Sequence, residues 1–312
     1  MTYRSSNNRL RKAAMPETRL HTSVTARLAG PLDANAIGRL MDTAWRAYQS
    51  FETSTWLDRV LRGDGWVACR GREVRGFVAV SLRPFGLARI VATAVANGDS
   101  AEEFAAAVLP PALAALKLRD VVSTLFVGDA PWLTELLAAH GFEQRETVIT
   151  YGRHASAPVP IVGNANVRLE PADISMLTEI ATLDRLAFGP IWHKPVEELT
   201  RVLAGEHPFV VAMHNGSIVG YQWHGYENEH GHINRLAVSP DWQGHGVGTR
   251  LLTEAMAAMF EVGVTWITLN TQESNVRSRR LYERFGFERV GHPAPLMWKD
   301  LDQAEARPVV RI

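Results

Sequence analysis

Three glycines at alternate positions, Gly244, Gly246 and Gly248, form the part of the sequence best suited to bind an anion. Glycine has no Cβ, so backbone N–H groups at these positions can approach a ligand closely. An apolar run precedes the glycines and a helical pattern follows them, so the same N–H groups lie at a helix N-terminus, where the helix dipole favours negative charge. No acidic residue lies between Gly244 and Arg250. The spacing therefore predicts a loop that holds a pyrophosphate.

Other phosphate-binding loops fit these residues less well. A dinucleotide-binding loop needs G-x-G-x-x-G in an early βαβ unit, with an acid about 20 residues later. A Walker loop needs a Gly-Lys-Ser/Thr end, which is missing here. From spacing alone, the plainest alternative is a glycine-rich turn that only opens a helix.

Further motifs surround the loop. Leu236-Ala-Val-Ser-Pro precedes it, and Gln243 opens the pattern Gln-x-x-Gly-x-Gly. Asn275 stands seven residues before Tyr282, which begins Tyr-Glu-Arg-Phe-Gly-Phe-Glu. In these motifs the chain resembles the GNAT superfamily of N-acetyltransferases. The resemblance has specific motifs over about 167–300 and survives only as a pattern over about 23–150.

The resemblance implies acetyl-CoA as the cosubstrate, with no metal. Backbone groups of Leu236 and Val238 would pair with the pantetheine arm. The amides from Gly244 to Thr249 would hold the pyrophosphate, and Asn275 would contact the cofactor arm. The residues expected to bind acetyl-CoA are Leu236, Ala237, Val238, Gln243, Gly244, His245, Gly246, Val247, Gly248, Thr249 and Asn275.

By the same resemblance, Tyr282 is the general acid that protonates the departing CoA thiolate. A tyrosine suits this task because its ordinary pKa near 10 keeps it protonated at neutral pH. The alternative is a helix residue that packs in the core beside Leu281 and Phe285.

An amine must lose a proton before it attacks a thioester, so the reaction also needs a base. In this superfamily the base often lies on the strand before the loop, where this chain has His232. Strand alternation predicts that His232 shares a face with Leu236, and its ordinary pKa near 6.5 suits a base at neutral pH. Glu227 and Glu229, acting through water, and His224 are alternatives. These residues also fit a plain polar hairpin.

Asn270 argues against one acceptor class. Enzymes that resemble ribosomal-protein alanine N-acetyltransferases place a catalytic glutamate five residues before the motif asparagine. In this chain that position is Asn270, which cannot act as a base. The sequence therefore disfavours a protein N-terminal acetylase of that kind.

The elements expected to position these residues alternate between strands and helices, which indicates an α/β (α+β) fold. Hydrophobic periodicity predicts the elements of the C-terminal half. They are a strand near 167–170, helices near 173–188 and 195–204, a hairpin at 208–227, a strand at 231–239, a helix at 244–262, a strand at 264–271, a helix at 275–285 and a final strand pair to about 299.

The chain also repeats itself. Gly76 and Gly220 lie in matching strand–turn–strand segments 144 residues apart, and Gly141 and Gly286 lie in matching Gly-Phe-Glu segments 145 residues apart. A near-constant offset indicates a duplication. We therefore expect two tandem GNAT-like domains, each a mixed, mostly antiparallel central sheet flanked by helices. The expected boundaries are a disordered tail at 1–22, a degenerate domain at 23–151, a linker at 152–166, a catalytic domain at 167–301 and a tail at 302–312.

The first copy lacks the chemistry of the second. Its matching loop has no glycine ladder, and Asp99, Glu102 and Glu103 occupy the start of the following helix, where they would repel a diphosphate. Pro110-Pro111 are expected to disturb that helix, and the tyrosine position holds Leu137. Tandem members of the superfamily with one degenerate half include the mycothiol synthases, whose length is similar.

Composition limits the partners. Thirty-three basic residues balance thirty-three acidic ones, so no global charge attracts nucleic acid or an anionic membrane. No stretch approaches the ~20 unbroken apolar residues of a membrane helix. The lone Cys69 fits a reducing cytoplasm and a buried, inert thiol. The expected partner is a small-molecule or peptide amine, and the oligomeric state stays open because two copies in one chain can make a monomer sufficient.

We therefore expect an acetyl-CoA-dependent N-acetyltransferase that works by direct attack of an amine on the thioester. The main alternative is a non-catalytic acyl-CoA-binding sensor or regulatory module. An interaction scaffold with two inert copies does not explain the intact glycine loop. Small polyamines, amino acids, antibiotics, aminosugars and peptide N-termini all remain open as acceptors.

Overall fold

The computed structural model describes residues 23–50, 56–205 and 207–301, so the tails expected at 1–22 and 302–312 lie outside the described residues. Its strands are β1 Val24–Leu28, β2 Arg46–Gln49, β3 Gly65–Arg70, β4 Glu73–Arg83, β5 Leu87–Val95, β6 Ser123–Val127, β7 Glu143–His154, β8 Arg168–Pro171, β9 Phe209–His214, β10 Ser217–Glu227, β11 His230–Val238, β12 Trp266–Gln272 and β13 Glu288–Asp300. Its α-helices are α1 Ala34–Thr43, α2 Trp56–Arg59, α3 Ala101–Lys117, α4 Pro131–Ala139, α5 Leu177–Trp192, α6 Val196–Leu203, α7 Val247–Glu261 and α8 Val276–Arg284.

The strands form one mixed, mostly antiparallel sheet in the order β1-β3-β4-β5-β6-β13-β7-β12-β11-β10-β9-β8, with β2 paired to β5 beside this path. The strand numbers rise from β1 at one edge to β6 and fall from β12 to β8 at the other edge, with β13 and β7 at the centre, so the two halves are arranged alike about the centre. We call β1 to β6 with α1 to α4 the N-terminal half, and β8 to β12 with α5 to α8 the C-terminal half. In each half one helix pair covers each face of the sheet. Helices α3 and α4 lie opposite α1 and α2, and α7 and α8 lie opposite α5 and α6. The expected tandem architecture is confirmed.

Two matched glycines show the duplication at the level of packing. A Cβ on Gly76 of β4 would lie 3.0 Å from the carbonyl oxygen of Ala94 on β5, and one on Gly220 of β10 would lie 2.9 Å from that of Ala237 on β11. Each glycine also lies beneath the helix that follows, α3 or α7. The same added Cβ would lie 2.6 Å from Phe104 of α3 at Gly76 and 3.0 Å from Leu251 of α7 at Gly220. Both halves therefore use a glycine for the same close approach.

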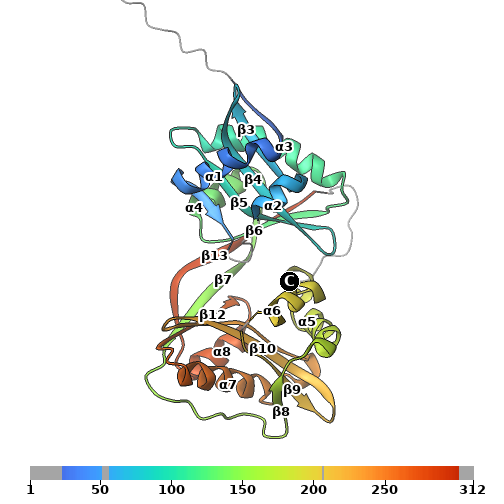
Figure 1. The fold of residues 1–312 in the computed structure, drawn as a ribbon, viewed down its shortest axis with the longest axis vertical. Coiled ribbons are helices and arrows are strands. Elements are labelled where there is room, and N and C mark those ends of the chain that lie inside the picture. Colours follow the sequence, from blue (N-terminus) through green and yellow to red (C-terminus); the bar gives the residue numbers. More distant parts are fainter. Residues whose placement is uncertain (1–22, 51–55, 206, 302–312) are drawn as a thin grey trace, which may run out of the picture.

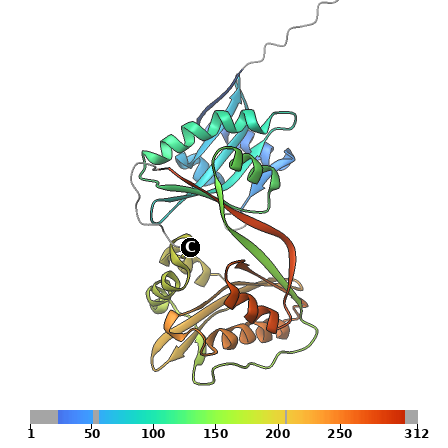
Figure 2. The same ribbon diagram turned by 180° about the vertical axis from the view of Figure 1, so that it is seen from behind.

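The two halves exchange their last strands, which join them in Figures 1 and 2. Residues 148–154 of β7 pair with β12 of the C-terminal half. Conversely, residues 296–300 of β13 pair with β6 of the N-terminal half, while β7 and β13 also pair with each other. The expected final strand pair of the C-terminal half is thus wrong. Gly291, at φ +66°, and Pro293 lie where the β7–β13 register shifts, but the chain continues as one strand instead of turning back.

Helix α3 also differs from expectation because it runs unbroken through Pro110 and Pro111. A proline loses one hydrogen bond, but its φ near −65° fits a helix. Val108, Leu109 and Ala112 beside the prolines are buried against the sheet, and this packing favours the helix. Like the other helices of the described residues, α3 is not long and apolar enough to cross a membrane.

Candidate active site

The site begins where β11 and β12 separate. These parallel strands pair only from His230 opposite Trp266 to Ile233 opposite Leu269. Beyond Ile233 both strands continue without pairing to each other, to the ends of β11 and β12. The separation leaves the edge of residues 236–238 facing an opening, as the resemblance implies for the strand that meets the pantetheine arm.

A turn at Pro240–Trp242 leads from β11 into the glycine loop. Gly244 and Gly246 have φ of +84° and +79°, a left-handed conformation that a side chain makes costly. Helix α7 therefore begins at Val247 and not at the expected residue 244. Gly246 is its N-cap and supplies no side-chain acceptor, so no cap competes with a ligand for the first amides of α7.

The opening and the loop form one cavity of about 630 Å³. Its lining includes nine of the eleven residues expected to bind the cofactor: Leu236, Ala237, Val238, Gln243, Gly244, Gly246, Gly248, Thr249 and Asn275. The other two lie beside the loop: Val247 is buried in the core, and the His245 ring faces Trp242, with ring centroids 6.0 Å apart. Ala187 and Phe188 of α5 also line the cavity.

Three arginines on one face of α8 also line the cavity, although none of them was among the residues expected from the sequence. Arg277, Arg280 and Arg284 stand three and four residues apart, a spacing that places them on one helix face. Arg284 Nη2 donates to Thr249 Oγ1 at 2.8 Å, and Arg277 donates to the side chain of Gln243. Their spacing of three and four residues could have predicted a basic face on this helix. They make the cavity lining basic although the chain as a whole has a formal net charge of zero.

The expected linker packs against the glycine loop. Asn164 donates its backbone N–H to the Gly246 carbonyl at 3.2 Å and its side-chain amide to the His245 carbonyl at 2.9 Å. Gly163, at φ +114°, has no room for a Cβ, which would lie 2.6 Å from the Gly246 carbonyl oxygen and the Arg250 nitrogen. These contacts engage two carbonyls of the loop and so fix the orientation of its peptides.

Tyr282 does not line the cavity. Its ring is buried in the core, 6.1 Å from the rings of both Tyr151 and Phe287. Burial raises the pKa of Tyr282 to about 12, while the nearby Ser278 hydroxyl acts in the opposite direction. Ser278, one helical turn earlier, does line the cavity. Asn275 lines it too and caps α8 by accepting the Ser278 N–H at 3.1 Å.

His232 lies just before the strands separate. Its Nδ1 is 2.8 Å from Thr268 Oγ1, and burial lowers its pKa, so the imidazole is neutral at pH 7. The expectation that His232 shares a face with Leu236 is wrong. Asn234 is the extra residue of a β-bulge, so Ile233 and Leu236 both pack in the core under α7 and His232 points to the other face.

The other candidates for the base are less well placed. Glu227 and Glu229 are exposed in the hairpin at the far end of β11. His224 is fully buried, and burial lowers its pKa to about 4, which makes it a weak base at neutral pH. Asn270 accepts a hydrogen bond from Thr150 at 2.8 Å. Of these residues, His232 is the one on β11 beside the opening.

The matching region of the N-terminal half is closed. Strand β2 pairs with residues 92–95 of β5, the edge that corresponds to residues 236–238 of β11. At the start of α3 the Ser100 side chain accepts the Glu103 N–H, and Glu102 and Glu103 lie in the first turn. Asp99 is paired with Arg75 at 2.6 Å.

Comparison with known proteins identifies the family. A model of the acetyltransferase (GNAT) family matches residues 177–287. A mycothiol acetyltransferase of Propionibacterium freudenreichii is 26% identical over 260 residues, with 78% of this chain and 78% of that protein covered. An acetyltransferase of Pectobacterium atrosepticum is 31% identical over 100 residues, with 32% of this chain and 71% of that protein covered.

Solved structures match the whole fold. A GCN5-related N-acetyltransferase from Sphaerobacter thermophilus superposes with a TM-score of 0.60 at 19% identity, covering 89% of this chain and 96% of that one. A tandem GNAT protein from the clavulanic acid biosynthesis pathway superposes with a TM-score of 0.62 at 16% identity, covering 91% and 99%. The family match spans the opening, the glycine loop and α8. The chain therefore belongs to the GNAT family of acetyltransferases and is an acyltransferase enzyme.

Proposed function

We propose that the protein is an acetyl-CoA-dependent N-acetyltransferase that transfers the acetyl group to an amine by direct attack. The observation that carries this proposal is the meeting of three features in one cavity: the open edge of β11, the N-terminus of α7 without a side-chain cap, and the arginine face of α8. Each matches a part of the cosubstrate, which has an amide-containing arm, a pyrophosphate and a further phosphate.

The residues present fit this cosubstrate. The backbone of Leu236 to Val238 does not pair with β12, which has separated at this point, so this edge can meet the pantetheine amides. The Val238 carbonyl accepts a hydrogen bond from Gln243 Nε2 at 3.2 Å, which the arm would have to share or displace. The amides of the glycine loop and of the first turn of α7 supply donors for the pyrophosphate. Arg280 and Arg284 stand beside them with positive charge, which attracts the phosphates.

We assign the general acid to Tyr282, acting through Ser278, which lines the cavity. When the amine nitrogen bonds to the acetyl carbon, the carbon–sulfur bond breaks and the CoA thiolate needs a proton. Ser278 can donate that proton from the cavity wall and take one from Tyr282 behind it. A pKa of about 12 keeps Tyr282 protonated at neutral pH, so its hydroxyl carries the proton when the reaction begins.

We assign the general base to His232. It lies four residues before Leu236, about 13 Å along an extended strand, so the amine proton reaches it through water. Because burial lowers the pKa of His232, the imidazole is unprotonated at neutral pH and can accept this proton. Its Nδ1 contact with Thr268 orients the ring.

We also propose that only the C-terminal half binds the cosubstrate. In the N-terminal half β2 occupies the strand edge that the pantetheine arm needs, and Ser100 caps the helix that would bind the pyrophosphate. The acidic first turn of α3 repels phosphate. The N-terminal half is thus degenerate as a binding site, and one chain binds one acetyl-CoA.

A thiol-release assay tests the proposed activity. The protein is mixed with acetyl-CoA and a panel of amines: a polyamine, free amino acids, glucosamine and a short peptide with a free N-terminus. We expect at least one amine to raise CoA release above its rate without amine, with the acetylated amine detected by mass spectrometry. Binding of acetyl-CoA with no acetylation of any amine would contradict the proposed acceptor class.

A further inference from the structure

A segment of the C-terminal half connects the cavity with the N-terminal half. This bridging segment, residues 188–198, begins with Phe188, which lines the cavity. Gly189, at φ +68°, interrupts the helical geometry of α5, so the chain leaves the cavity wall there. The segment ends at Glu198 in the first turn of α6. The segment therefore begins at the cavity and ends in α6. Whether a contact at Glu198 affects Phe188 depends on the residues between them.

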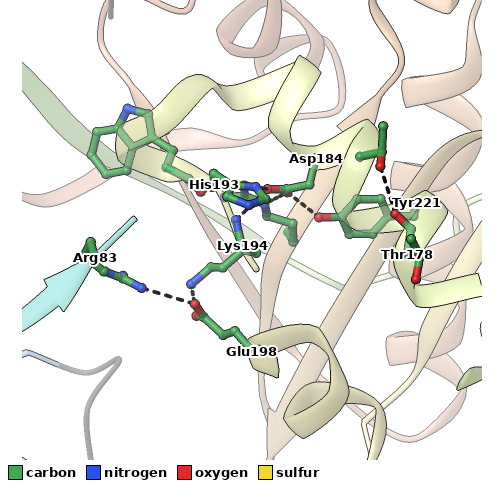
Figure 3. Close-up of polar contacts among 10 residues, drawn as sticks. Arg83, Thr178, Asp184, His193, Lys194, Glu198 and Tyr221 are labelled. Atoms are coloured by element: carbon green, nitrogen blue, oxygen red, sulfur yellow. Dashed lines mark hydrogen bonds and ion pairs between the residues drawn. The ribbon is translucent and has the colours of Figure 1, made fainter. Parts of the chain in front are cut away.

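Asp184, which is fully buried, anchors the middle of the bridging segment. Its Oδ1 accepts the Lys194 backbone N–H at 2.7 Å and lies 3.3 Å from His193 Nδ1. Its Oδ2 accepts the Tyr221 hydroxyl and two guanidinium N–H groups of Arg235, from Nε at 2.8 Å and Nη2 at 2.6 Å. Figure 3 shows Asp184 between the bridging segment and Tyr221. A buried carboxylate with so many donors has little freedom to move.

Arg235 connects Asp184 with Phe188 at the cavity. Its Nη2 also donates to the Trp192 carbonyl at 2.7 Å. Its guanidinium carbon lies 3.4 Å from the centre of the Phe188 ring, a cation–π contact. The orientation of Phe188 at the cavity wall therefore depends on Arg235, and Arg235 is held by Asp184 and by the bridging segment.

The N-terminal half holds the other end of the bridging segment. Arg83, at the end of β4, forms an ion pair with Glu198 at 3.2 Å, and Glu198 also binds the Lys194 ammonium group. Both contacts are visible in Figure 3. In the turn after β4, the ring of Phe85 lies 6.4 Å from the ring of His193. The Arg83 and Glu198 side chains are 23% and 20% exposed, so water screens the pair only in part.

Apolar packing supports the same connection. Ile191 and Trp192 of the bridging segment contact a core cluster built by the N-terminal half and β13. Its buried members are Leu87, Leu125, Val127, Leu296 and Trp298. The N-terminal half therefore contacts the bridging segment through charge, through an aromatic pair and through a shared core.

We propose that Arg83 and Phe85 of the N-terminal half are positioning residues for the acyl site. They hold the bridging segment and, through Arg235, fix Phe188 against the acyl group of the bound thioester. The inference rests on the proposed function, because it places the acyl group beside Phe188. By this proposal the N-terminal half, which binds no cosubstrate itself, has a role in the reaction of the C-terminal half.

Calorimetry with two probes, acetyl-CoA and CoA, tests this role without a known amine. The two probes differ only in the acyl group, so the ratio of their Kd values reports the acyl site. We expect Arg83→Ala to raise the Kd of acetyl-CoA about threefold or more and to leave the Kd of CoA within about twofold. Phe188→Ala should do the same. The double variant should lose no more than the larger single loss, because both residues act through one wall.

Matched variants separate positioning from general destabilisation. Arg83→Lys keeps the ion pair and should restore most of the Kd ratio. Arg119 forms a comparable pair with Asp64 in the N-terminal half at 2.8 Å, and Arg119→Ala should change neither Kd. If Arg83→Ala does not fold, Phe85→Ala, which removes the ring contact with His193, is measured in its place.

Three results would overturn the proposal. The first is a folded Arg83→Ala or Phe85→Ala variant with wild-type Kd values for both probes, and the second is an equal loss of affinity for both probes. Either result refutes the positioning role and leaves the proposed function intact. The third is a wild-type protein that binds neither acetyl-CoA nor CoA, which removes the proposed function and this inference together.

Discussion

Replacing Gly246 with alanine tests whether left-handed backbone shapes the glycine loop. Gly246 has φ +79°, and a new Cβ would lie 3.2 Å from the Asn164 nitrogen, closer than most such contacts. Holding an L-residue in this conformation costs about 1–2 kcal/mol. We therefore expect Gly246→Ala to lower the free energy of unfolding by about 1–2 kcal/mol. If the loop relaxes instead, the Kd of acetyl-CoA should rise by up to about 5–30-fold.

Gly248→Ala is the matched control because it lies two residues away, inside α7. Its Cβ would meet Val238 Cγ2 at 3.5 Å, an ordinary contact, and its φ is not left-handed. Alanine favours a helix over glycine by up to about 1 kcal/mol, so this variant should be as stable as wild type or more stable. Urea unfolding without ligand measures both. A Gly246→Ala variant with both wild-type stability and the wild-type Kd of acetyl-CoA, or a larger loss of stability in Gly248→Ala, would refute the reasoning.

Three further predictions concern titrating side chains. Tyr282→Phe should lower kcat about 10-fold or more with little change in the Kd of acetyl-CoA, and equal losses in both would remove its acid role. His232→Gln should lower kcat/KM and abolish an inflection of the pH–rate profile below pH 6.5, where burial places the pKa of His232; an unchanged profile would exclude it as the base. His224 has a folded-state pKa of about 4 against 6.5 unfolded, so the unfolded chain binds more protons between these values, and stability should fall as pH drops from 6.5 to 4. The loss in the free energy of unfolding is at most about 3 kcal/mol. Urea unfolding at pH 7 and pH 4.5 should show a smaller loss in His224→Gln than in wild type. An identical loss in the two proteins would contradict the assignment.

The sequence predicted a glycine loop that opens a helix because both features depend on neighbouring residues. The helix begins at Val247 and not at residue 244, because Gly244 and Gly246 adopt the left-handed conformation. The fold class followed from the alternation of elements and from the repeat. The arginine face of α8 was also local, and its regular spacing could have been used.

Features that depend on distant pairing could not be predicted. The strand exchange needs residues 148–154 to pair with β12, more than 110 positions later in the chain, and no local pattern encodes such a partner. The bulge at Asn234 reverses the face of His232, and it is visible only when β10 pairs with β11. Arg83 and Glu198 are 115 residues apart, so their contact follows from the docking of the two halves.

The central claim is that one cavity in the C-terminal half binds acetyl-CoA. Isothermal titration calorimetry of wild type and of Gly246→Glu tests it most directly, because glutamate there adds a side chain and a negative charge to the loop. We expect wild type to bind one acetyl-CoA per chain and Gly246→Glu, still folded, to bind none. Two equivalents for wild type, no binding by wild type, or undiminished binding by Gly246→Glu would each contradict the account.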